Sequence, residues 1–177
     1  MLLDGKVALV SGTGPNIGAE VARTLAANGA TVACMDLNEE YAQAAALSIN
    51  ESGGQAMGIA TDITQPESVE KAIQKVIGAF GRIHLLVNDA AISDRKKFLE
   101  TDLADWKKVI DVILTGTFIV SQKVALQMVA QGEGGSVVNI VSTSGHRGES
   151  ARIAYGTAKA GLLNFTRSMA VQLAPSK

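Results

Sequence analysis

Short apolar runs alternate with helix-like patterns along almost the whole of this 177-residue chain. The runs have the length of buried strands, and the segments between them carry apolar residues at helical spacing. Parallel strands need such crossover connections, so the alternation predicts a parallel sheet with helices on both faces, a doubly wound α/β fold. The expected strands are residues 6–11, 31–35, 55–61, 83–87 and 137–141.

The helices expected between these strands are amphipathic. The one after the first strand is expected to bury Ile17, Val21 and Leu25, which lie four residues apart. Later helices are expected over residues 39–52, 69–80, 102–130 and 151–174. Neither a repeat nor a linker interrupts the alternation, so a single domain over residues 1–177 is predicted.

Composition excludes several classes of function. A net charge of −1 provides no basic field for nucleic acid, and a lone cysteine, Cys34, excludes internal disulfides and multi-cysteine metal sites. No metal site is expected. The sequence shows no signal peptide and no uninterrupted apolar run of about 18 residues, so neither export nor membrane insertion is expected. We therefore expect a cytoplasmic protein.

Tyr155 and Lys159 lie four residues apart in the last expected helix and so share one face of it. An ammonium there can stabilise a phenolate, which allows the tyrosine to act as an acid or base. Ser142 follows the fifth strand and is expected to point into the crevice where parallel sheets bind ligands. Because a Tyr-x-x-x-Lys pattern also arises by chance, an ordinary helix face remains an alternative.

A glycine-containing turn follows the first strand and opens a helix. Gly12 suits a tight turn, Gly18 suits close packing of the helix on the sheet, and the N–H groups around Asn16 and Ile17 could face a pyrophosphate. Asn16 is expected to tolerate a left-handed backbone there. The alternative is an ordinary strand-to-helix turn.

Asp36 closes the second strand, 18 residues beyond Gly18, and Leu37 follows it. A carboxylate there can accept hydrogen bonds from the ribose hydroxyls of an adenosine and would repel a 2′-phosphate. This arrangement favours NAD over NADP. A solvated acid at a strand end is the alternative.

These features together resemble the short-chain dehydrogenase/reductase family from about Lys6 to Pro175. The resemblance implies hydride transfer between NAD and an alcohol or carbonyl substrate, with Tyr155 as acid/base, Ser142 holding the substrate oxygen and Lys159 holding the nicotinamide ribose. Asp62 and Ile63 resemble the Asp-Val pair that contacts adenine. Asn88-Asp89-Ala90-Ala91 resembles Asn-Asn-Ala-Gly, which implies that Asn88 and Ala90 lie at the cofactor. The resemblance also implies a homodimer or homotetramer formed through the 102–130 and 151–174 helices.

The sequence departs from the family pattern at several positions. Asn16 replaces a glycine of the turn, Ala91 replaces another glycine, and Ile113 stands where the family has an asparagine that supports a proton relay. Family members also continue beyond the residues that match Leu173-Ala174-Pro175, so we expect this sheet to lack its last strands. Two alternatives therefore stay open: a catalytically silent dinucleotide-binding or oligomerising module, and an inactive fragment of a longer dehydrogenase.

Overall fold

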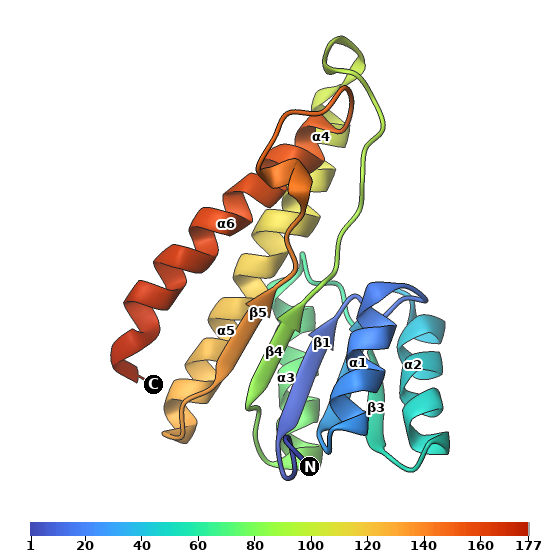
Figure 1. Ribbon diagram of the computed structural model, residues 1–177, viewed down its shortest axis with the longest axis vertical. Helices are drawn as coiled ribbons and strands as arrows, with labels where there is room; N and C mark the ends of the chain where they lie inside the picture. The colour runs from blue at the N-terminus through green and yellow to red at the C-terminus, as the bar shows by residue number, and fades with distance from the viewer. Residues whose placement is uncertain (177) are drawn as a thin grey trace.

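The computed structural model describes residues 1–176, which contain a five-stranded parallel sheet (Figure 1). The sheet has the strand order β3-β2-β1-β4-β5. The chain adds β2 and β3 on one side of β1 and then places β4 and β5 on the other side, so the strand order reverses between β1 and β4. This order is the doubly wound arrangement that the alternation predicts, so the predicted fold is confirmed. The strands are β1 (Val7–Ser11), β2 (Thr31–Asp36), β3 (Gln55–Ala60), β4 (Leu85–Asn88) and β5 (Ser136–Asn139).

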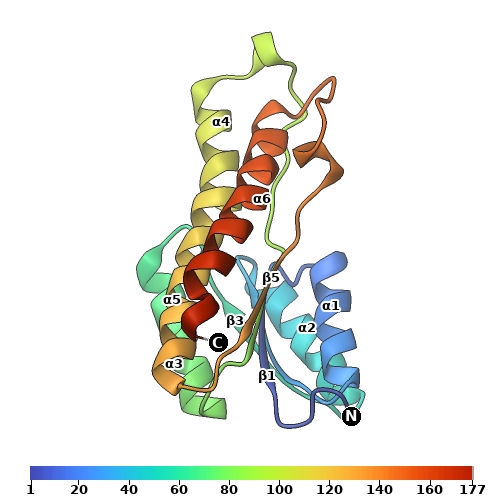
Figure 2. The ribbon, with the colours of Figure 1, turned by 60° about the vertical axis from the view of Figure 1, so that its left-hand side comes forward.

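Helices cover the two faces of the sheet and continue above its carboxyl end (Figures 1 and 2). Two of them, α1 and α2, pack on one face, whereas α3 and α5 pack on the other. The last helix, α6, runs beside α4 and α5 in both views. The helices are α1 (Ile17–Ala27), α2 (Glu39–Glu51), α3 (Pro66–Phe80), α4 (Leu103–Ile110), α5 (Thr117–Gln131) and α6 (Ile153–Leu173).

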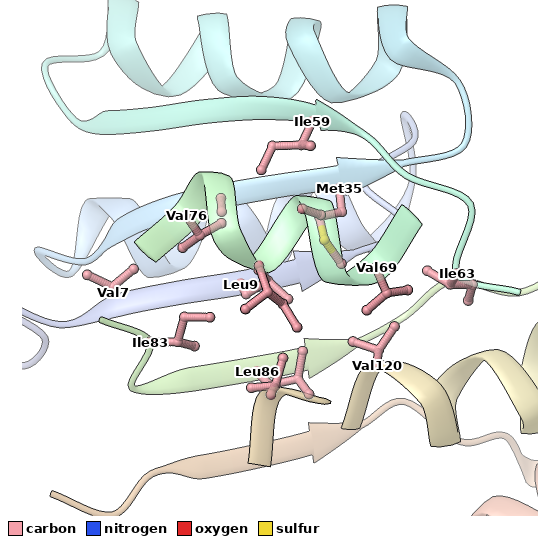
Figure 3. Close-up of a cluster of buried hydrophobic side chains, with 14 of the residues drawn as sticks. Val7, Leu9, Met35, Ile59, Ile63, Val69, Val76, Ile83, Leu86 and Val120 are labelled. Carbon is pink, nitrogen blue, oxygen red and sulfur yellow. The ribbon is translucent and has the colours of Figure 1, made fainter. Parts of the chain in front are cut away.

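The main core lies between the sheet and the helices α3 and α5. Leu9 and Leu86 from the sheet meet Val69 of α3 and Val120 of α5, and all four are fully buried (Figure 3). The opposite face uses smaller residues, including Cys34, which is fully buried. Burial raises the pKa of the Cys34 thiol to about 12, as suits a core residue rather than a reactive thiol.

Small residues make the closest contacts of α1 with the sheet, which corrects the expected stripe in part: Val21 and Leu25 are half-buried and pack against the core, but Ile17 does not. Gly18, Ala19 and Ala22 are the buried residues, while Ile17 is 59% exposed. The helix approaches the sheet so closely that a Cβ on Gly18 would lie 2.0 Å from the Gly12 carbonyl oxygen. A large side chain could not face the sheet there.

The helix expected over 102–130 is continuous from Leu103 to Gln131, but a π-helical segment, Asp111–Gly116, interrupts its α-helical pattern. By length and composition this helix could cross a membrane. Val120, Val124 and Met128 instead pack against the sheet, as they would in the core helix of a globular protein. The π segment places Ile113 in the interior, fully buried.

Two strand ends differ from the expected boundaries in ways that affect the site. β4 continues through Asn88, so this residue belongs to the sheet. β5 ends at Asn139, so Ser142 lies in the connection beyond the strand and begins a short 3-10 turn over Thr143–Gly145.

Candidate active site

A cavity of about 750 Å³ opens at the carboxyl end of the sheet. In a doubly wound sheet this edge is where ligands bind. Tyr155 and Lys159 of α6 line the cavity from the side. Every strand contributes a lining residue at or just beyond its carboxyl end: Gly12, Asp36, Thr61, Asp89 and Ile140.

Gly12 lines the cavity between the ends of β1 and β4, where the strand order reverses. Its φ of 81° lies in the left-handed region, and a Cβ there would lie 2.5 Å from the Cα and backbone nitrogen of Ala90. Only glycine permits this approach between the chain segments that follow β1 and β4. Ala90, which the sequence also placed at the cofactor, lines the cavity beside it.

The turn from Gly12 into α1 follows the expected path, but Asn16 does not use the expected conformation. Its φ is −130°, so no left-handed residue is needed at this position. The Asn16 side chain makes no capping hydrogen bond, and both Asn16 and Ile17 line the cavity. Gly18 is not a lining residue, and its backbone N–H stabilises the charged carboxylate of Asp89.

Asp36 lines the cavity beside the glycine turn. Its Oδ1 accepts the backbone N–H of Asn38 at 2.9 Å, and its Oδ2 lies 3.6 Å from the position of a Cβ on Gly14. Leu37 and Tyr41 also line the cavity, and both side chains are exposed.

Asp62 and Ile63 both line the far end of the cavity, beyond β3. The Asp62 carboxylate already accepts two hydrogen bonds from Thr64, at 2.9 Å from the backbone N–H and 2.7 Å from the hydroxyl. Ile63 packs against the π segment, where a Cβ on Gly116 would lie 2.8 Å from its side chain. The two residues therefore shape this end of the cavity as well as lining it.

Asn88 lies beneath the cavity and is not one of its lining residues. Its Nδ2 donates to Ser121 Oγ at 2.9 Å and to Asn139 Oδ1 at 2.8 Å. Asn139 in turn donates to Thr166 Oγ1 at 2.9 Å. The buried amide of Asn88 thus joins β4 to α5 and, through β5, to α6. Sequence spacing alone does not reveal these distant partners.

Lys159 is almost fully buried beside Tyr155. Its Nζ donates to the Ile140 carbonyl at 2.6 Å and lies 5.8 Å from the centre of the Tyr155 ring. Burial lowers the pKa of the Lys159 ammonium, and the negative charge of Asp89 opposes this shift. The expected pairing of Tyr155 and Lys159 on one helix face is therefore present in the structure.

Asp94 holds the start of the helix that carries this pair, a role that the sequence interpretation missed. Its Oδ1 accepts the backbone N–H of Tyr155 at 3.1 Å, near the N-terminus of α6. A carboxylate is favourable at a helix N-terminus. An acidic residue in the long polar loop before α4 gave no sequence signal for a cap more than sixty residues away.

Ser142 is not one of the residues that line the cavity, and its hydroxyl bonds to Ser144. It donates to Ser144 Oγ at 3.2 Å and accepts the Ser144 N–H at 3.1 Å. Ser144 donates to Glu149 at 2.6 Å, Glu149 pairs with Arg152 at 2.6 Å, and the Arg152 guanidinium lies 5.8 Å from the Tyr155 ring centre. A continuous set of contacts therefore links Ser142 to Tyr155 around the loop.

Apolar side chains pack against the Tyr155 ring on its other side. Ile113 forms a buried cluster with Val109, Ala154, Ala158 and Leu162, and Tyr155 packs against this cluster. The position that carries an amide in the family pattern is filled here by hydrocarbon. The cluster fixes the Tyr155 ring by packing rather than by hydrogen bonds.

Comparison with known proteins identifies relatives over nearly the whole chain. Residues 6–177 match the family model described as short chain dehydrogenase. The 3-oxoacyl-[acyl-carrier-protein] reductase FabG of Aquifex aeolicus is 41% identical over 98% of this chain and 70% of its own length. D-threitol dehydrogenase of Mycolicibacterium smegmatis is 36% identical over 96% of this chain and 65% of its own length.

A solved structure with the same fold is described as NAD⁺-bound xylitol dehydrogenase. It superposes with a TM-score of 0.96 at 34% identity, covering 100% of this chain and 68% of the other. The present chain thus spans roughly two thirds of the length of these relatives. The family match and these identities show that the chain belongs to the short-chain dehydrogenase/reductase family.

Proposed function

We propose that this chain transfers a hydride between NAD and a small alcohol or carbonyl substrate, with Tyr155 as the acid/base. One observation carries the proposal. Tyr155 and Lys159 line the same cavity as the Gly12 turn and Asp36. A proton-transfer group and a dinucleotide-binding turn therefore share one space.

The residues of the cavity fit a nicotinamide dinucleotide. Its volume lies in the range of small-molecule sites, and Gly12 leaves the floor free of a side chain. Asn16 and Ile17 would face the pyrophosphate at the N-terminus of α1. The remaining assignments are Asp36 and Leu37 at the adenosine ribose, Asp62 and Ile63 at the adenine, and Ala90 and Lys159 at the nicotinamide ribose. Gly18 and Asn88 would act indirectly, by holding α1 and β4 in place.

When bound, the nicotinamide ring would supply or accept the hydride. The Tyr155 hydroxyl would exchange a proton with the substrate oxygen as alcohol and carbonyl interconvert. The Lys159 ammonium would stabilise the negative charge that develops on the phenol oxygen. Ser142 would hold the substrate oxygen, which requires its hydroxyl to turn away from Ser144.

Asp36 supports NAD rather than NADP as the cofactor. Among residues 1–176, Lys159 is the only cationic side chain that lines the cavity, and it lies beside Tyr155 at the opposite end from Asp36. A 2′-phosphate at Asp36 would therefore face a carboxylate without a compensating cation. The NAD⁺-bound xylitol dehydrogenase of similar fold agrees with this choice.

We further propose that two or four copies of the chain associate in the cytoplasm. The helical stretch 102–130 and the helix 151–174 would form the contact. Large apolar side chains on them are exposed, including Phe118, Leu126 and Val171. The single cysteine of the chain is buried and free, which suits a reducing compartment.

A second candidate is a dinucleotide-binding module that performs no turnover. Two observations favour it: Ile113 provides no polar group beside Tyr155, and the Ser142 hydroxyl is committed to Ser144. The cavity would then bind the cofactor without the proton relay that a rapid reaction needs.

The Tyr155→Phe variant separates these functions. Turnover would be measured with NAD on alcohols and with NADH on carbonyl compounds, including threitol, xylitol and a 3-oxoacyl carrier-protein thioester, which the names of the relatives suggest. We expect wild-type turnover, no turnover in Tyr155→Phe, and NADH affinity within a few-fold of wild type. The control is Thr157→Val, which removes an exposed hydroxyl from the same helix and should leave turnover unchanged. Full activity in Tyr155→Phe would contradict the assignment, and NADH binding without wild-type turnover would favour the silent module.

A further inference from the structure

The cavity is unusually acidic for a site that binds a pyrophosphate. Its titratable lining residues are Asp36, Tyr41, Asp62, Asp89, Tyr155 and Lys159. Three carboxylates therefore face a single ammonium among the described lining residues. A bound dinucleotide would add the negative charges of its two phosphates to this space.

Asp89 is the carboxylate that lies beside the first turn of α1. Its backbone N–H donates to the Ser11 carbonyl at 3.1 Å, which fixes the residue beside the end of β1. Its Oδ2 lies 3.0 Å from the position that a Cβ on Gly18 would occupy. Gly18 is the second residue of α1, so the carboxylate lies at the positive end of this helix.

The surroundings of Asp89 disfavour the charged form of its carboxyl group. Burial raises the pKa of the Asp89 carboxyl above its ordinary value, whereas the Lys159 charge and the Gly18 N–H partly oppose the shift. Lys159 on α6 is the cation facing Asp89. The other ionisable groups of the cavity are Tyr155 on α6, Asp36 and Tyr41 at the end of β2 and in α2, and Asp62 after β3. None of these adds positive charge at α1.

We propose that Asp89 limits the affinity of the cavity for its dinucleotide, because its carboxylate competes with the cofactor phosphates for the N-terminus of α1. The proposal rests on the proposed function, since it presumes that a nicotinamide dinucleotide occupies this cavity. Asp62 does not play this role, because both of its hydrogen bonds come from Thr64 beyond β3.

The proposal predicts a pH dependence with a definite sign. Protonation of Asp89 removes the negative charge that opposes the phosphates, so cofactor affinity rises as pH falls toward the raised pKa of this carboxyl. At high pH Asp89 is fully charged and affinity is lowest. Deprotonation of Lys159, whose pKa burial lowers, would weaken binding at high pH as well. A variant that removes only the Asp89 charge separates the two contributions.

The test measures NADH binding by nicotinamide fluorescence in wild type, Asp89→Asn and the matched control Glu51→Gln. Asparagine keeps the shape and an oxygen acceptor for Gly18 while removing the charge. Glu51→Gln removes one exposed charge at the end of α2, outside the cavity. At pH 8 we expect Asp89→Asn to bind NADH about tenfold more tightly than wild type, a 1.4 kcal/mol difference. The control should match wild type, and the advantage of Asp89→Asn should shrink toward pH 5.5.

Equal or weaker NADH binding by a folded Asp89→Asn protein would overturn the inference and leave the proposed function intact. Should Asp89→Asn not fold, the wild-type pH series decides: a Kd that falls as pH is lowered toward the raised pKa of Asp89 supports the inference, and a Kd that stays constant over the pH range in which the protein is folded overturns it. If Asp89→Asn bound NADH and wild type did not, the inference would have its strongest support. Failure of both proteins to bind NADH or NADPH at any pH would overturn the proposed function and the inference together.

Discussion

Ile113 is a single residue whose burial controls the surroundings of the candidate acid/base. It is fully buried among side chains that also pack against Tyr155. Ile113→Asn would bury an amide where the neighbouring side chains are apolar, and a polar group without a partner costs about 1–3 kcal/mol. We expect the free energy of unfolding in urea to fall by at least that amount.

The matched control is Ile113→Leu, which keeps the volume apolar and should cost less than about 1.5 kcal/mol. An Ile113→Asn protein as stable as wild type would show that a water or a polar group satisfies the amide. In that case the position could support the proton relay that the family pattern implies, and turnover should increase. The stability measurement thus also decides how Ile113 should be interpreted.

The sequence was informative about residues whose role depends on their own backbone or on near neighbours. Gly12, Asp36 and the pair Tyr155 and Lys159 all line the cavity, because strand ends and helical spacing dictate their positions. Ser142 and Asn88 were harder to place. Their side chains follow hydrogen-bond partners, and those of Asn88 lie more than thirty residues away. The distant partners of Asn88 have no signature in local spacing, whereas Ser142 bonds to the nearby Ser144 in a 3-10 turn that the apolar run before it does not predict.

At the scale of elements, the 3-10 turn after β5 sets the position of α6. Gly145 in this turn touches the helix backbone: a Cβ there would lie 2.9 Å from the Ala160 nitrogen and 3.0 Å from the Lys159 carbonyl oxygen. Gly145→Ala must push α6 away, since backbone atoms cannot rotate aside. We expect it to cost about 1–3 kcal/mol of unfolding free energy and to weaken NADH binding by displacing Lys159.

Gly148→Ala is the control for this prediction, because a Cβ on Gly148 meets nothing within 4 Å. Both variants are compared by urea unfolding and by NADH titration. If Gly145→Ala matched Gly148→Ala in stability and affinity, the contact between this turn and α6 would not position Lys159.

The order and type of the elements were predictable, whereas some of their details were not. Short apolar runs predicted the five strands, and 3.6-residue patterns predicted the large helices, all within a few residues. The π segment at Asp111–Gly116 was not predicted, because it depends on how the long helix passes Ile63 and α6. The inward face of α1 was predicted only in part: Val21 and Leu25 pack against the core, whereas Ile17 is exposed because close packing on the sheet selects small residues such as Gly18.

At the scale of the whole molecule, α6 and the helices beside it leave apolar side chains uncovered. Leu103, Phe118, Leu126 and Val171 are each between 44% and 76% exposed. If these faces meet a second copy, light scattering at micromolar concentration should give two or four times the 18.4 kDa chain mass. Leu126→Lys should shift the mass toward the monomer without unfolding the chain, because this side chain does not contribute to the core.

A discrete mass is required for this prediction. β5 forms one edge of the sheet, and its Val138 is 50% exposed, so irregular aggregates could also arise from edge pairing. A monodisperse monomer at these concentrations would contradict the proposed association. A broad distribution of masses would point to the strand edge rather than to the helices.

The central claim is that the cavity binds NAD with Asp36 at the adenosine ribose, and its most direct test compares NADH and NADPH affinities in wild type and Asp36→Arg. Close like charges cost several kcal/mol when they are desolvated. We therefore predict that wild type binds NADH at least about a hundredfold more tightly than NADPH, and that Asp36→Arg narrows or inverts this ratio. Equal affinities in wild type, or a ratio unchanged by the substitution, would contradict the account.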